Sequence, residues 1–185
     1  MKKRLMIYVL LSLLLSPCEA QQKMRDVFLQ MPDSLLPYLT ENNRLDFLDF
    51  MDSNMKAEVT NELGGKSEML SLSDSALAIQ VSPAMRVAMR LMPVTEAVDS
   101  CQQVVCVIST YGKDAPESQL AVYSVRWRPL LSERYLSGLP RPPYEASFVE
   151  GATSIRLKGA VALDPIAYEE QQKTESWLKN IEWIQ

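Results

Sequence analysis

Cationic and aromatic side chains between positions 86 and 135 are the residues of this chain best suited to hold a ligand. The guanidinium group of arginine binds carboxylates through paired hydrogen bonds, and a cation is attracted to the face of an aromatic ring. A surface that combines both kinds of side chain binds an acidic or sugar-bearing partner without any proton transfer. We expect a ligand-binding face formed by Arg86, Arg90, Arg126, Trp127, Arg128 and Tyr135.

A second arrangement of the same residues remains open. Trp127 follows Tyr123 and Val125 at two-residue spacing, which places all three side chains on one face of a β-strand. If that face is the core, Trp127 points inward while the arginines point to water, and no joint surface forms.

The sequence contains no histidine, and this excludes several classes of enzyme. Ser-His-Asp and Cys-His mechanisms lack their base, and zinc sites that use imidazole lack a ligand. We expect no catalytic residues of these kinds, no metal and no cofactor. Glycosidic chemistry needs only two carboxylates and stays open, although no particular pair stands out among the acidic residues.

Cys101 and Cys106 allow two states in an exported protein. Along one straight strand their Cα atoms would be about 17 Å apart, beyond the roughly 7 Å limit for a disulfide. A bond therefore needs a turn at Gln102 and Gln103, whereas Val104 and Val105 have strand character. A Cys101–Cys106 disulfide and two buried thiols are both open.

The first twenty residues have the pattern of a signal peptide. Three basic residues at 2–4 precede an apolar run over 5–15, and Ala20 fits the cleavage position. About eleven apolar residues are too few to span a bilayer. We expect export to the periplasm or cell surface, in preference to a lipoprotein attached through Cys18, because Pro17 fits poorly before a lipid-modified cysteine.

Charge and length limit the partners of the remaining chain. Removing residues 1–20 deletes three of 19 basic and one of 23 acidic residues, which leaves a net charge of −6. A nucleic-acid partner is not expected, because a phosphate backbone requires a basic face. No later segment approaches membrane-spanning length. Residues 21–185 are enough for one domain with a single sizeable core.

Helical spacing occurs near the start of the mature chain. Met24, Val27, Phe28 and Met31 lie on one helical face, which Pro32 ends. Asn42 or Asn43 is expected to cap a second helix, with Leu45, Leu48, Met51 or Met55, and Val59 on its buried face. Gly64 and Gly65 are expected to end that helix.

Strands follow over 69–127. Met85, Val87, Met89 and Leu91 alternate with Arg86, Ala88 and Arg90, so one face is expected in the core and the other in water. Leu70 and Leu72 are expected to join Leu77, Ile79 and Val81 in a hairpin across Asp74 and Ser75. The segment 103–111 is apolar on both faces, which is typical of a strand covered on both sides.

The last part of the chain predicts an extended Pro-rich connection at 139–143, a strand at 155–161 and a helix at 164–173. The segment 176–185 suits a helix or a closing strand. Helices followed by an antiparallel meander indicate an α+β fold, with the N-terminal helices packed on one face of the sheet.

One stretch of the chain resembles a known family. Met31 to Pro37, Leu39 with Thr40, Asn42 to Asp46, Asp49 with Phe50, and Gly64 with Gly65 are similar to the signature of an uncharacterised family of secreted proteins from Bacteroidetes. The resemblance covers 31–65. It implies export, one domain, and a β-α-β ending in which 176–185 closes as a strand, and it supplies no catalytic residue.

These observations favour a non-enzymatic interaction or ligand-binding module outside the cytoplasm, with an envelope protein or a glycan as its partner. The alternative is a hydrolase that acts on polysaccharide through carboxylates.

Export yields a direct prediction. Protein recovered from its native host should lie outside the cytoplasm and begin at Gln21, because a signal peptide is removed at a small residue. N-terminal sequencing checks this. An intact cytoplasmic species beginning at Met1 would contradict export, whereas an acylated Cys18 terminus would establish the lipoprotein alternative.

Overall fold

The computed structural model describes residues 21–140, 143–159 and 178–184 of the chain. The expected signal peptide with Cys18, and the expected helix at 164–173, lie outside these residues. Part of the expected Pro-rich connection also lies outside them.

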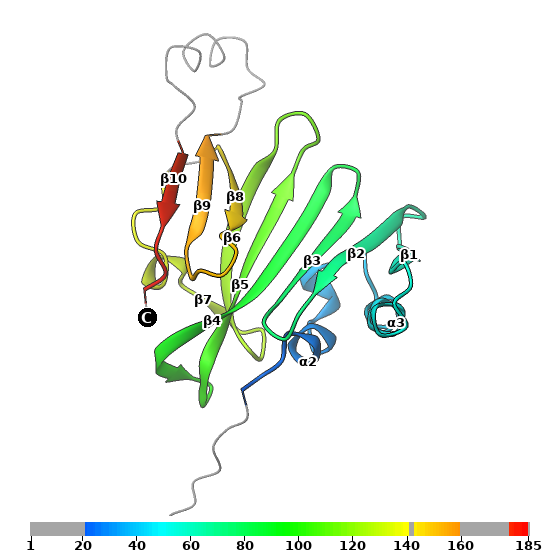
Figure 1. Ribbon diagram of the computed structural model, residues 1–185, viewed down its shortest axis with the longest axis horizontal. Helices are drawn as coiled ribbons and strands as arrows, with labels where there is room; N and C mark the ends of the chain where they lie inside the picture. The colour runs from blue at the N-terminus through cyan, green and yellow to red at the C-terminus, as the bar shows by residue number, and fades with distance from the viewer. Residues whose placement is uncertain (1–20, 141–142, 160–177, 185) are drawn as a thin grey trace, which may run out of the picture.

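A seven-stranded antiparallel sheet forms the centre of the structure, and its strands lie in chain order (Figure 1). This confirms the predicted meander over 69–127. The strands are β1 (Glu58–Thr60), β2 (Lys66–Leu72), β3 (Ala76–Ser82), β4 (Met85–Val98), β5 (Cys101–Tyr111), β6 (Glu117–Ser124) and β7 (Pro129–Leu130).

A second antiparallel sheet, which the sequence did not predict, is formed by the last strands of the chain. It contains β8 (Tyr144–Phe148), β9 (Ile155–Gly159) and β10 (Leu178–Ile181) in the order β10-β9-β8. The strand at the C-terminal end is confirmed for 178–181. The prediction missed the second sheet because β8 directly follows a Pro-rich segment and has no clear strand signal of its own.

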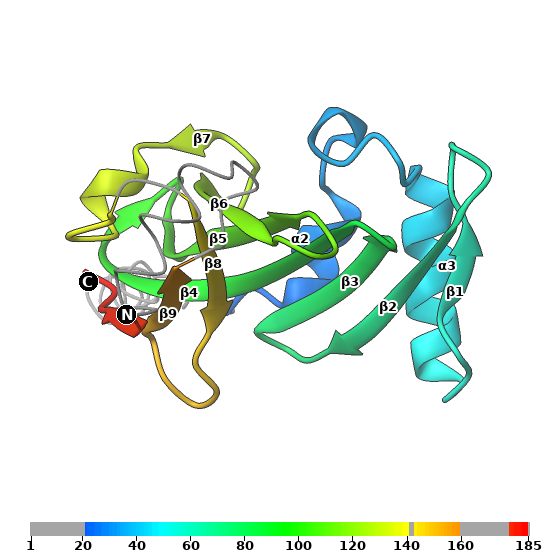
Figure 2. The same ribbon diagram turned by 90° about the horizontal axis from the view of Figure 1, so that it is seen from above.

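Two short α-helices lie in the described residues: α2 (Met24–Leu29) and α3 (Glu41–Asp52). Single 3₁₀ turns occur at Asp33–Leu35 (η1) and Ser132–Arg134 (η2). The fold is therefore predominantly β, and α+β describes it only loosely. The helices do not form a layer over the sheet, because α2 lies against the strands while α3 lies beside the β1–β2 edge (Figure 2).

The ends of α3 differ from the prediction. Thr40 is the N-cap, and its side chain accepts a hydrogen bond from the Asn43 amide while the Asn43 side chain accepts one from the Thr40 amide. This is a reciprocal capping box, so neither asparagine is the cap. The helix ends at Asp52, well before the glycines, because residues 58–60 pair with 66–68 as strands. Gly64 instead adopts a φ of 75° in the turn between β1 and β2.

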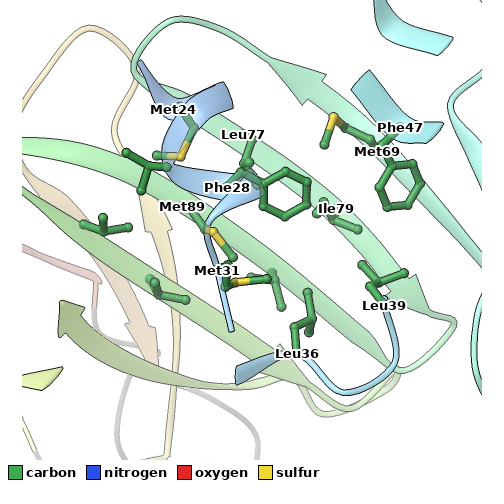
Figure 3. Close-up of a cluster of buried hydrophobic side chains, with 14 of the residues drawn as sticks. Met24, Phe28, Met31, Leu36, Leu39, Phe47, Met69, Leu77, Ile79 and Met89 are labelled. Atoms are coloured by element: carbon green, nitrogen blue, oxygen red, sulfur yellow. The ribbon is translucent and has the colours of Figure 1, made fainter. Parts of the chain in front are cut away.

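The first hydrophobic core lies between the helices and one face of the central sheet. The helices contribute Phe28 and Phe47, and the sheet contributes Leu77, Ile79 and Met89 (Figure 3). Met24, Val27, Phe28 and Met31 are buried as predicted. On α3, Leu48 is buried and Met51 packs against the core as expected, whereas Leu45 is 42% exposed and Phe47, which was not predicted, is buried.

The second core lies on the opposite face of the central sheet, beneath β8–β10. Val104, Cys106 and Ile108 of β5 belong to this core, whereas Val105 and Val107 belong to the first. Strand β5 is therefore covered on both faces, as its sequence predicted. Figure 2 shows α2 and the second sheet on opposite sides of β4.

A bulge changes the predicted β2–β3 hairpin. The register shifts between Met69 and Ser71, so Met69 enters the core while Leu70 is half exposed. The expected hairpin forms and Leu72 pairs with Leu77, but Leu70 does not join its core face, because one extra residue at a bulge exchanges the two faces of a strand.

The alternation in β4 gives a stability prediction. Met89 is 2% exposed in the first core, and Met89→Asp should lower the free energy of unfolding by about 3–5 kcal/mol because it buries a charge without a partner. The control Leu131→Asp changes a residue that is 78% exposed and should stay within about 0.5 kcal/mol. Denaturant melts measure both, and equal losses would contradict the burial of Met89 in the first core.

Candidate functional site

An open trough on the central sheet is the best candidate for a binding site. It has a volume of about 350 Å³ and lies between β2–β4 and the neighbouring strand β8. This volume is at the lower end of the range of about 300–1,000 Å³ for ligand pockets. The lining residues are mainly small or polar: Ser71, Ala76, Leu77, Ala78, Arg86, Ala88, Met89, Arg90, Ile108, Thr110, Ala146, Ser147 and Phe148.

The register of the sheet explains why the trough is open. Ser71 pairs with Ala78, Ala78 pairs with Ala88, and Ala88 pairs with Ile108. Side chains directly opposite in a sheet point to the same face, so these four residues form one row across β2–β5. The first three side chains of the row are small, and Ile108 on β5 is large. The second sheet covers the row from Ile108 onward, and the small residues form the floor of the trough.

Arg90 connects the floor to the second sheet. Its Nη1 donates hydrogen bonds to the carbonyls of Val149 and Ala152, both at 2.8 Å, and its guanidinium lies 4.6 Å from the centre of the Phe148 ring. Partial burial lowers the pKa of Arg90, although guanidinium remains charged at any physiological pH. Arg90 is therefore less solvated than the water-facing residue predicted from the alternation.

Arg86 lies at the other end of the trough. Its Nη2 is 3.2 Å from a carboxylate oxygen of Glu145 on β8, and both side chains are partly exposed. An exposed pair of this kind contributes little to stability, at most about 1 kcal/mol. Arg86 can therefore exchange Glu145 for a ligand carboxylate at small cost.

The structure brings together two of the six residues predicted to form a ligand-binding face. Arg86 and Arg90 both line the trough. Arg126 is exposed next to the turn after β6, and Arg128 pairs with Asp99 at 2.6 Å. Trp127 and Tyr135 are both 6% exposed. No single surface contains all six residues, because both aromatic side chains are buried.

Trp127 anchors the first helix. Its indole N–H donates a hydrogen bond to the Val27 carbonyl at 2.8 Å. Its φ of 63° is unusual for a bulky residue and occurs in the tight turn from Ser124 to Arg128. Trp127 thus points into the core, as the alternative arrangement predicted. It does so from a turn and not from a strand, because β6 ends at Ser124.

Tyr135 has a similar anchoring role near the C-terminal end of the described chain. Its ring stacks on Trp183 with centroids 5.3 Å apart. The Trp183 indole N–H donates to the Pro93 carbonyl at 2.7 Å, and the Ile184 amide donates to the Tyr135 carbonyl at 2.9 Å. These contacts attach Trp183 to β4 and Ile184 to Tyr135, so neither ring is available to stack on a ligand.

The two described cysteines are free thiols, so the disulfide alternative is not formed. Cys101 lies in the first core and Cys106 in the second. Because the residues are an odd number of positions apart on β5, their side chains point to opposite faces of the sheet. Burial raises the pKa of the Cys106 thiol to about 12.

The segment at 31–65 that resembles a family signature has structural roles in this fold. Arg44 is almost completely buried, and its Nη1 donates to Asp33 at 2.8 Å and to the Leu39 carbonyl at 3.0 Å. Asn61 accepts hydrogen bonds from the Leu63 and Gly65 amides in the β1–β2 turn. These residues attach the loop before α3 and close a hairpin.

No group of three or more Cys, Asp or Glu residues in the described part of the chain is placed to hold a metal ion. In the same residues, no helix is long and apolar enough to cross a membrane.

Comparison with known proteins identifies the family. The model of a protein family of unknown function, DUF3256, matches residues 18–168. This chain belongs to the DUF3256 family. This confirms that the resemblance at 31–65 is to a family of unknown function. Secretion stays a prediction.

The DUF3256 fold is also present in a solved structure. A domain of an uncharacterised protein from Porphyromonas gingivalis W83 matches with a TM-score of 0.66 and 20% sequence identity. The match covers 88% of this chain and 96% of that one. At this identity the likeness concerns the fold. No match was found among curated proteins.

Sequence reasoning missed the floor of the trough and the wall that β8 provides. The signal in the sequence was the occurrence of alanine at alternate positions, at 76 and 78 on β3 and at 88 between two arginines on β4. Alternate small residues on the outer face of a strand were treated as solvent-facing, because the sequence does not show that a second sheet stops beside them.

The free thiols give a prediction for this DUF3256 protein. In the chain that starts at Gln21, neither Cys101 nor Cys106 should react with Ellman's reagent at mildly alkaline pH, because both are buried and the pKa of Cys106 is raised. Both should react in concentrated guanidinium chloride. Failure to detect any thiol after unfolding would show that a disulfide exists.

Proposed function

We propose that this DUF3256 protein is exported and acts outside the cytoplasm as a non-enzymatic interaction module. It holds an envelope protein or glycan in the trough between β2–β4 and β8. The observation that carries the proposal is the trough itself. Its floor of Ser71, Ala78 and Ala88 is open, and Arg86 and Arg90 lie along one side of it.

The carboxylates support binding more than catalysis. No Asp or Glu lines the trough in the described residues, and Glu145 at its rim is paired with Arg86. A general acid or base needs a carboxyl poised near the working pH, and the acid of a glycosidase has a raised pKa. Where the pKa of a carboxyl in the described residues is shifted, it is lowered instead.

Three carboxyls have lowered pKa values because of the groups that bind them. The pKa of Asp52 is lowered by its hydrogen bond with Arg25, and that of Glu58 by its hydrogen bond with Lys56. The pKa of Asp99 is lowered first by Ser124 and then by Arg128. Carboxyls of this kind remain ionised and serve in surface ion pairs.

A filled trough tests the proposal. Ala78→Trp places a large side chain between Ser71 and Ala88, and tryptophan is well tolerated in strands. We expect the purified variant to lose the partner retained by wild type on a glycan array or from envelope extract, with the partner identified by mass spectrometry.

Ala78→Ser is the matched control at the same position, because it keeps the trough open and should retain the partner. Thermal melts verify that both variants fold. A partner retained equally by wild type, Ala78→Trp and Ala78→Ser would show that the trough is not the binding site. Hydrolysis of a polysaccharide by wild type would support the carboxylate-dependent alternative.

A further inference from the structure

We propose that the trough receives an extended peptide segment of a partner protein, which adds as a fourth strand to the free edge of β8 and places an acidic side chain beside Arg90. This inference rests on the proposed function of the trough and specifies the chemistry of its occupant.

Strand β8 has one free edge. The order β10-β9-β8 leaves β8 with a partner on one side only, and Figure 1 shows β8 as the strand of that sheet nearest to β2–β4. An exposed strand edge is a template for pairing with another chain. Recognition by strand addition uses this kind of edge.

The hydrogen-bond pattern shows which residues of β8 face outward. The Val149 amide donates to the Ser154 carbonyl across the turn, whereas the Ala146 amide donates away from β9, to Ser118 Oγ at 2.9 Å. In an antiparallel pair, the backbone groups of successive residues point alternately toward and away from the partner strand. The amide and carbonyl of Phe148 therefore point away from β9, as those of Ala146 do. Ser118 satisfies the Ala146 amide. A new strand therefore pairs chiefly at Phe148, which lines the trough.

The position of a fourth strand coincides with the trough. Strand β8 contacts β5 and β6, and the next strand of its sheet would lie about 4.8 Å further along. Phe148 of β8 lines the trough together with the row Ala88, Ala78 and Ser71, so an added strand that pairs at Phe148 lies over this low floor. The second sheet thus ends at β8, beside the part of the central sheet that carries small side chains.

Charge identifies the side chain that the occupant should carry. In the described residues, Arg90 has no carboxylate within ion-pair distance, and its Nη1 donates instead to the neutral carbonyls of Val149 and Ala152. Both of these bonds use Nη1, so the guanidinium retains further donors. A half-buried charge gains from a counter-ion in the same environment. A carboxylate on the occupant supplies that counter-ion.

A peptide fits this site better than a sugar does. Sugar sites present the face of an aromatic ring, and Phe148 is the one aromatic residue that lines the trough among the described residues. The Arg90 guanidinium already covers that ring. Backbone groups at an edge and a small-residue floor are the features that an extended peptide uses.

A phage-displayed library of random dodecapeptides tests the inference on the chain that starts at Gln21. We expect selected peptides to alternate apolar residues and to contain an acidic residue. Affinity of the synthesised peptides, measured by isothermal titration calorimetry, should fall at least about tenfold for Ala78→Trp and stay unchanged for Ala78→Ser. Replacement of the acidic residue by its amide should weaken binding to wild type, and this effect should disappear in Arg90→Met.

Strand addition is tested on the peptide itself, which avoids any question of folding. Methylation of alternate backbone amides removes the donors that would face β8, and it should abolish binding when applied in one register but not in the other. Equal affinity of the two methylated forms, or of the acid and amide forms, would overturn the inference.

The outcomes separate this inference from the proposed function. If no selected peptide depends on the residue at 78, while an envelope partner or glycan is still lost in Ala78→Trp, the peptide inference fails and the trough remains the binding site. If neither peptide nor envelope partner responds to Ala78→Trp, both proposals fail.

Discussion

The pairing of β4 with β5 is the interaction on which the rest of the structure depends. The two strands stay in register from Met85 opposite Tyr111 to Pro93 opposite Gln103. On one face they carry Met89 and Val105 into the core shared with the helices, and on the other they carry Met92 and Cys106 beneath the second sheet. Because both cores use the same two strands, a loss of this pairing would remove the support of both. Burial on both faces also explains why the middle of β5, from Val104 to Ile108, is apolar without interruption.

The trough results from an unequal division of this central sheet. Residues of α2 and α3 pack against one face of the central sheet in the first core. On the opposite face, Ser71, Ala78 and Ala88 lie outside the second core, which includes Ile108 of β5 and Met92 of β4. Small residues at Ser71, Ala78 and Ala88 are compatible with an uncovered face, because they expose little apolar surface to water. Arg86 and Arg90 mark the boundary, since each reaches from β4 to the second sheet. Their contacts orient β8 beside the trough and keep charged groups at its side.

Several residues that could do chemistry are instead used to hold segments together. Trp127 fixes α2, Trp183 fixes the end of the described chain to β4, and the buried Arg44 fixes the loop that contains Asp33. The indole N–H groups of both tryptophans and Nη1 of Arg44 donate to main-chain carbonyls or a carboxylate, which offsets the cost of removing these groups from water. The glycines at 64 and 65 lie in the turn of a hairpin that Asn61 closes.

The sequence by itself determined the elements whose patterns are local. Alternation at Met85–Leu91 and the two apolar faces of 103–111 predicted core strands correctly, and the spacing of Met24, Val27 and Phe28 predicted α2, because side-chain direction follows from the period of each element. Only the tertiary structure decided which residues form a site. Arg90 was predicted to lie in water and instead reaches Val149 and Ala152, 59 and 62 positions away in the chain. The bulge before Ser71, the burial of Trp127 in a turn and the end of the second sheet at β8 likewise depend on contacts between distant segments, and no local period encodes them.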